Sequence, residues 1–129
     1  MSVVVGYVAT PEGEAALATA TAEARRRGVP VVVVVSERGH LGVPGGAHDE
    51  TVEEVRRRLQ ADGLDFDLVS TTRGRDVADD IVGAAVSSGA QLIVIGLRRR
   101  SPVGKLLLGS NAQRILLDAP CPGLAVKPD

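Results

Sequence analysis

Apolar and polar residues follow two alternating patterns along the chain. In four segments the apolar residues form short, nearly uninterrupted runs, as expected of strands, and these segments are residues 1–8, 31–35, 92–95 and 124–126. A fifth strand is predicted over residues 66–72, where apolar and polar residues alternate weakly. Between them, apolar residues three or four positions apart predict four helices, over about residues 11–27, 52–62, 76–88 and 110–116. Strands that alternate with helices in this way imply a parallel sheet with helices on both faces.

Residues at the expected helix ends agree with these boundaries. Thr10 has the hydroxyl of a helix cap, and Gly28 can supply the left-handed conformation that ends the first helix. The three arginines at residues 25–27 lie where the helix dipole is negative, which gives them a structural role. Asp76 and Ser110 are expected to cap the third and fourth helices.

The strand sequences also suggest an order in the sheet. The five valines at residues 31–35 are apolar on both faces, which is typical of a central strand covered by helices. Pro120 and Pro122 precede the last strand, and since proline cannot donate to a central ladder, that strand belongs at an edge. The alternation of strands and helices predicts a doubly wound α/β fold, formed by one domain over residues 1–129. For its five-stranded parallel sheet we expect the order 3-2-1-4-5.

Composition and charge narrow the function classes. With 44% hydrophobic and 24% charged residues, the 129-residue chain can bury a core. Its net charge is −1 and only 2% of its residues are aromatic, so neither a basic surface nor a stacking platform for nucleic acid is expected. No apolar run approaches the roughly 18 residues of a membrane helix, and the N-terminus lacks a signal-peptide pattern. We therefore expect a cytoplasmic protein that binds no membrane.

The predicted strand order indicates where a ligand would bind. In such sheets ligands bind at the carboxyl ends of the strands where the order reverses, which brings residues 6–10 next to residues 96–111. Gly96 follows a strand directly, whereas Gly109 and Ser110 begin a helix whose free amides and positive dipole end suit an anion such as phosphate. The segment is no Walker A loop, because its Gly-Lys pair is followed by leucine, and it has no GxGxxG spacing.

Both ends of the sequence resemble the universal stress proteins of the UspA type. At the N-terminus, a strand is followed by a turn containing Thr10, then Pro-Glu and an alanine-rich helix. Residues 92–127 contain Leu-Ile-Val-Ile-Gly, a loop, Leu-Leu-Gly-Ser, a helix, then Ala-Pro-Cys-Pro and a strand. The resemblance covers essentially the whole chain and implies this family's fold and a regulatory function.

The resemblance to the members of this family that bind ATP is partial. Those members share a glycine, two residues, a glycine, nine residues, a glycine, then serine or threonine. Gly96, Gly109 and Ser110 match this pattern with 12 residues between the two glycines, but Arg99 replaces the middle glycine. The binders also resemble one another in an aspartate at the end of the first strand that contacts the nucleoside, and here Val8 takes its place.

The resemblance thus implies a site for ATP or a related adenine nucleotide, with Mg²⁺ accompanying it. The expected nucleotide-binding residues are Thr10, Val35, Ser36, Gly96, Arg98, Arg99, Lys105, Gly109, Ser110 and Asn111. Val35 and Ser36 are included because, in the family members that bind ATP, the adenine lies against the end of the second strand. Arg99 supports two opposite interpretations: its guanidinium can grip a phosphate, or its side chain can fill the space of the phosphates.

Two functions of different classes follow from these residues. The first is a regulatory domain that responds to an adenine nucleotide, which the match at Gly96, Gly109 and Ser110 favours. The second is a nucleotide-free interaction module of the same fold, which Val8 and Arg99 favour.

Dimerisation is expected in either case. Members of the family commonly pair as homodimers through the last strand, and the short apolar segment 124–126 suits such pairing. No catalytic set of residues can be assembled, so no enzyme is predicted and slow ATP hydrolysis ranks last. His40 and His48 are expected to face solvent, so no metal site with protein ligands is predicted.

Overall fold

The computed structural model describes residues 1–36, 46–71, 76–100 and 105–128. Its strands are β1 (Ser2–Tyr7), β2 (Val31–Val35), β3 (Phe66–Ser70), β4 (Ala90–Gly96), β5 (Arg98–Arg100), β6 (Lys105–Leu107) and β7 (Gly123–Val126). Its helices are α1 (Pro11–Arg27), α2 (Gly46–Ala61), α3 (Val77–Ser88) and α4 (Ser110–Asp118). Five strands form one parallel sheet in the order β3-β2-β1-β4-β7, which confirms the predicted doubly wound α/β fold and its 3-2-1-4-5 order.

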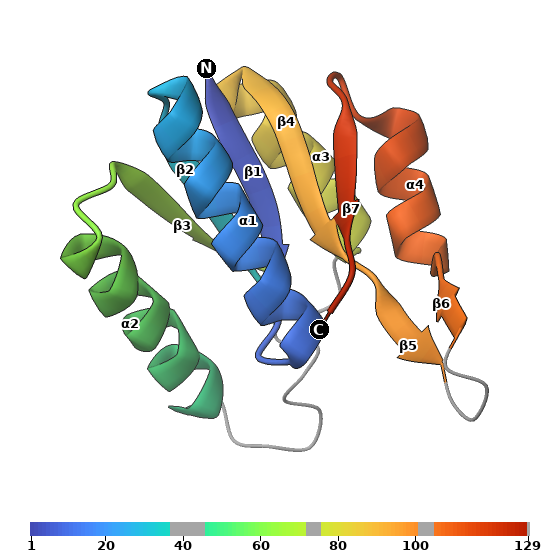
Figure 1. Cartoon of the computed structure of the whole chain (residues 1–129), viewed down its shortest axis with the longest axis horizontal. Helices are drawn as coiled ribbons and strands as arrows, with labels where there is room; N and C mark the ends of the chain where they lie inside the picture. Colours follow the sequence, from blue (N-terminus) through green and yellow to red (C-terminus); the bar gives the residue numbers. More distant parts are fainter. Residues whose placement is uncertain (37–45, 72–75, 101–104, 129) are drawn as a thin grey trace.

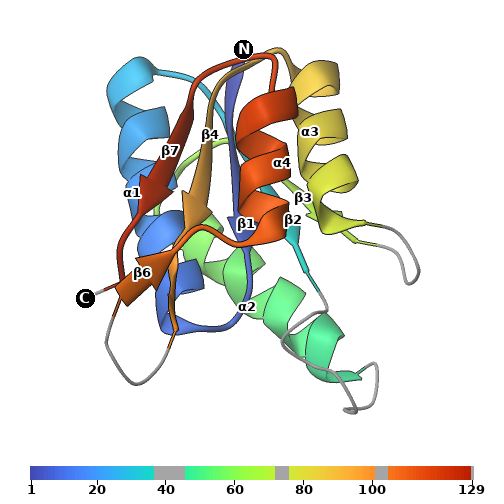
Figure 2. The same ribbon diagram turned by 90° about the vertical axis from the view of Figure 1, so that its right-hand side faces the viewer.

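Helices cover both faces of the sheet, as Figures 1 and 2 show. Because side chains alternate along a strand, each strand contributes to two separate core clusters. The first cluster lies under α1 and α2 and includes Val33 and Val35, whereas the second lies under α3 and α4 and includes Val34. All five valines of β2 are buried, as expected of a central strand with helices on both sides.

Most of the predicted helix ends are confirmed. The Thr10 hydroxyl accepts a hydrogen bond from the Gly13 amide at 3.1 Å, and Gly28 ends α1 with a φ of 69°. Asp76 caps α3 by accepting from the Ala78 amide at 2.9 Å. The predicted cap at Ser110 is wrong, because Ser110 is already the first helical residue and Gly109 occupies the cap position without a side-chain acceptor.

Two strand predictions also need correction. The third strand ends at Ser70 and not at residue 72. The segment between Gly96 and Leu107, expected to be a loop, contains the antiparallel pair β5 and β6, in which Arg98 lies opposite Leu107. Pairing the two halves of the segment satisfies backbone amides and carbonyls that a loop would leave to solvent.

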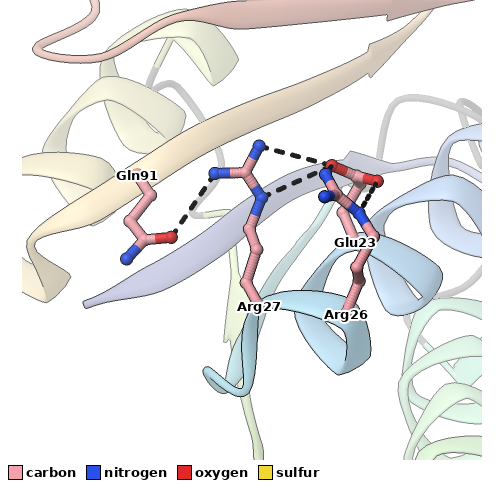
Figure 3. Close-up of polar contacts among 4 residues, drawn as sticks. All are labelled: Glu23, Arg26, Arg27 and Gln91. Carbon is pink, nitrogen blue, oxygen red and sulfur yellow. Dashed lines mark hydrogen bonds and ion pairs between the residues drawn. The ribbon is translucent and has the colours of Figure 1, made fainter.

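The arginines at the end of α1 have partners in addition to the helix dipole. Arg26 and Arg27 both contact the Glu23 carboxylate, at 2.6 and 3.3 Å, and Arg27 also donates to the Gln91 side chain of β4 at 3.4 Å (Figure 3). Arg25 donates to the Asp62 carbonyl at the end of α2 at 3.4 Å. These contacts join α1 to β4 and α2 at the amino ends of the strands, away from the predicted ligand site.

Candidate functional site

A cavity of about 180 Å³ lies at the carboxyl ends of β1 and β4, where the strand order reverses. This is the place that the predicted topology indicated for a ligand. Its lining comes from β1, the first turn of α1, β2, α3, β4 and the first turns of α4: Gly6, Tyr7, Val8, Glu12, Gly13, Val34, Ser36, Val77, Ile81, Ile95, Gly96, Leu97, Gly109, Ser110, Asn111, Ala112 and Ile115.

One side of the cavity is a continuation of the second core cluster. Val34, Ile81, Ile95 and Ile115 belong to that cluster and also line the cavity, and all four are buried. A ligand that enters therefore meets an aliphatic wall, against which an apolar or aromatic group would bury its surface.

The first turn of α4 contributes polar backbone groups to the cavity. The first backbone bond of this helix runs from the Gln113 amide to the Gly109 carbonyl at 3.0 Å, so the amides of residues 110–112 have no acceptor within the helix. Ser110, Asn111 and Ala112 all line the cavity. Free amides and the positive end of the helix dipole make this rim suitable for an anionic group.

The two matched glycines of the pattern, Gly96 and Gly109, have different surroundings. A Cβ placed on Gly96 would lie 2.4 Å from the Glu12 carbonyl oxygen, so glycine is needed there for α1 to pack against the end of β4. A Cβ placed on Gly109 would have no heavy atom of the described residues within 4 Å apart from its two chain neighbours, and the φ of −69° suits any residue. Nothing in the described chain requires glycine at position 109, whereas a ligand close to its backbone would.

An ion-pair cluster holds α4 against α3. Arg114 contacts the carboxylates of Asp76 and Asp79 at the first turn of α3. Both partners raise the pKa of the Arg114 guanidinium through their charges, so it stays protonated. Because Arg114 is one turn beyond Ser110, this contact fixes the amino end of α4 beside the cavity.

The structure brings half of the predicted nucleotide-binding residues together. Ser36, Gly96, Gly109, Ser110 and Asn111 all line the cavity.

Two predicted residues lie elsewhere, and three have side chains outside the described part. The Thr10 hydroxyl is engaged as the cap of α1, and Val35 belongs to the first core cluster, so Val34 faces the cavity in its place. Side-chain positions of Arg98, Arg99 and Lys105 fall outside the described part of the structure. The same holds for His40 and His48, so the sequence predictions for these two residues are not addressed by the structure.

One acid of the site, Glu12, was not among the residues predicted from the sequence. Glu12 is the only charged residue among the described residues that line the cavity. Its position two residues after the Thr10 cap gave a signal, but acids are common there for helix stability alone.

A second feature that the sequence did not predict is a polar cluster of Tyr7, at the end of β1, with Glu14 and Arg58. The buried Tyr7 hydroxyl donates to Glu14 of α1 at 2.5 Å, and Arg58 of α2 contacts the same carboxylate at 2.8 Å. Burial, followed by the bond to Glu14, raises the pKa of Tyr7 well above its ordinary value. The Arg58 hydrogen bond, against the opposing effect of burial, lowers the pKa of Glu14. The cluster joins both helices of one face to a strand that ends at the cavity.

No group of three or more metal-ligating side chains occurs within the described ranges. Nor is any of the described helices long and apolar enough to span a membrane.

Comparisons with known proteins agree with this fold. The sequence profile of the universal stress protein family matches residues 1–127. A universal stress protein from Mycolicibacterium smegmatis is 43% identical over 127 residues, which cover 98% of this chain and 97% of the relative. The chain therefore belongs to the universal stress protein family, as its two ends indicated.

Solved structures extend the comparison to the backbone. The structure of a universal stress protein from Archaeoglobus fulgidus is 34% identical, with a TM-score of 0.78 and coverage of 98% of each chain. The structure of the universal stress protein from Archaeoglobus fulgidus in complex with dAMP is 29% identical, with a TM-score of 0.74 and the same coverage.

Proposed function

We propose that this protein binds an adenine nucleotide in the cavity between β1 and β4 and acts as a regulatory domain of the cytoplasm, without turnover. The observation that carries the proposal is the amino end of α4: its free amides border the cavity, and Gly109 has no side chain although nothing in the described chain requires this. A phosphate that approaches these amides closely would account for both features. The dAMP complex of a relative that is 29% identical supports an adenine nucleotide as the ligand.

The proposed ligand-binding residues are a smaller set than the sequence indicated. Ser36, Gly96, Gly109, Ser110 and Asn111 remain, whereas Thr10 and Val35 are better explained by capping and by the core. The aliphatic wall suits the base or the ribose carbons, and the α4 amides suit a phosphate. Arg98, Arg99 and Lys105 keep their predicted role as phosphate ligands on sequence grounds, with Mg²⁺ bound through the phosphates.

Calorimetric titration of nucleotide-stripped protein with AMP, ADP and ATP, with Mg²⁺ present, tests the proposal. We expect saturable binding in the parent protein and its loss in Gly109→Val, whose side chain would occupy the space beside the α4 amides. Gly83→Val is the matched control, because Gly83 also has open space around its Cβ but lies on α3 outside the cavity lining. Unchanged affinity in Gly109→Val, or no binding by the parent at millimolar nucleotide, contradicts the proposal.

The second candidate function is a nucleotide-free interaction module that works as a homodimer through β7. Its support is the position of β7 at the edge of the sheet, with Leu124 39% exposed. An exposed apolar edge strand is suited to pairing with a second copy. Sedimentation is expected to give the mass of two chains, and proline at Ala125 is expected to shift the protein to one chain by removing a ladder donor. A single-chain mass for the parent at micromolar concentration contradicts the dimer.

A further inference from the structure

Glu12 combines two observations that helix stability does not explain. It lines the cavity, and it is the only charged residue among the described residues that do so. It also adjoins the end of β4, because a Cβ placed on Gly96 would lie 3.0 Å from the Glu12 Cβ. Glu12 therefore lines the same cavity as the α4 amides that we propose as the phosphate site.

Glu14, the neighbouring acid in this turn, has a structural role. Glu14 is engaged by Arg58 at 2.8 Å and by Tyr7 at 2.5 Å, so its charge is neutralised locally. No ion pair of the Glu12 carboxylate occurs among the described residues. Within the described part of the chain, no cation neutralises the charge of Glu12, so this charge can act on an anion in the cavity.

A cavity of this size keeps its lining groups within roughly one Debye length, about 10 Å at ~0.1 M salt, so this charge is felt by a bound anion. Every further phosphate on a nucleotide adds negative charge and increases repulsion from Glu12. A divalent cation bound between the phosphates and the carboxylate would reverse the sign of the interaction.

We propose that Glu12 makes the site selective for nucleotide charge. Without a divalent cation it disfavours a nucleoside triphosphate relative to the monophosphate, and with Mg²⁺ this penalty disappears. The inference rests on the proposed function, since it concerns the same cavity. It gives Glu12 a role in specificity in addition to its favourable position at the positive end of the α1 dipole.

Calorimetric titrations of the full chain with AMP and with ATP, in chelator and in excess Mg²⁺, test this role. In chelator, Glu12→Gln is expected to raise the ATP-to-AMP affinity ratio about fivefold, the factor for one additional unit charge about 8 Å away at an effective dielectric constant of about 40. AMP binding is expected to tighten less than ATP binding, because AMP carries fewer phosphate charges. In Mg²⁺, the difference between parent and variant is expected to shrink or reverse.

Glu53→Gln is the control, because it makes the same charge change on an exposed position of α2 outside the cavity. It is expected to leave the ATP-to-AMP affinity ratio at the parent value. Melting curves of each variant check that the fold is intact. If both nucleotides bind the parent and Glu12→Gln leaves their ratio unchanged in both buffers, the role of Glu12 is refuted and the proposed function stands. If the parent binds neither nucleotide, both proposals fail.

Discussion

Alanine substitutions at Gly96 and Gly109 are expected to affect stability very differently, although the two glycines belong to one sequence pattern. At Gly96 the new Cβ would lie 2.4 Å from the carbonyl oxygen and 2.8 Å from the carbonyl carbon of Glu12. Both are backbone atoms of the first turn of α1, so the whole turn would have to move. At Gly109 the new Cβ would meet no heavy atom of the described residues within 4 Å, apart from its two neighbours in the chain.

These contacts set the expected magnitudes. Overpacking costs about 1–3 kcal/mol, and alanine recovers only about 0.4–1 kcal/mol by restricting the unfolded chain, so Gly96→Ala should lose about 1–2 kcal/mol. At Gly109 the backbone is already extended, with φ −69° and ψ 169°. Alanine is a poorer cap than glycine by about 0.5–1 kcal/mol, which offsets the unfolded-state gain. Gly109→Ala should therefore stay within about 0.5 kcal/mol of the parent.

Urea unfolding followed by far-ultraviolet circular dichroism measures both values, at one protein concentration so that any dimer contributes equally. The same proteins titrated with AMP complete the comparison, because Gly109→Ala is expected to weaken binding without weakening the fold. Equal destabilisation by the two substitutions would refute the argument that one glycine is kept for packing and the other for a ligand.

Two further predictions concern the face covered by α1 and α2. Tyr7 is the only tyrosine and the chain has no tryptophan, so its phenolate absorbance is expected to titrate well above its ordinary pKa of 10.0 and to return to that value on unfolding. Because the pKa of Tyr7 is raised in the folded protein, its contribution to the free energy of unfolding is fully present below pH 10.0 and is lost as the pH rises toward the folded pKa. Tyr7→Phe should abolish this loss. A midpoint near 10.0 in the folded parent contradicts the burial argument. Leu59→Ala should lower the free energy of unfolding by about 2–4 kcal/mol, because Leu59 is 1% exposed. Leu117→Ala, at a position 83% exposed, should change it by less than about 0.5 kcal/mol in the same urea assay, and similar losses at both positions would contradict the assigned burial.

The fold was predictable because several sequence signals agreed on it. The valine run of β2 required helices on both faces, and the proline before Gly123 required an edge for β7. Caps at Thr10 and Asp76 marked the starts of two helices. The β5–β6 pair was missed because its strands have three residues each, too few for a period-2 pattern to be recognised.

The site was less predictable because its signals are ambiguous at the level of single residues. Five identical valines contain no contrast between the two faces, so the choice between Val34 and Val35 as the cavity residue could not be made from the sequence. Thr10 has a hydroxyl that can serve a helix cap or a ligand, and the cap is used. Glu12 was overlooked because the preference of a helix start for acids explains it equally well.

The side chain of Val8 matters more for what the cavity can bind than for how the chain folds. The turn that it begins is closed by the backbone: the Thr10 amide donates to the Val8 carbonyl at 2.8 Å, and a Cβ on Gly13 would lie 1.8 Å from that same oxygen. Both contacts use the main chain of residue 8, so the turn would form with valine or with the aspartate of nucleotide-binding members. The side chain at this position is therefore free to vary with what the cavity binds. With an apolar residue there, polar recognition of the proposed nucleotide would come mainly from the α4 amides, so affinity is expected to depend on the phosphate end of that ligand.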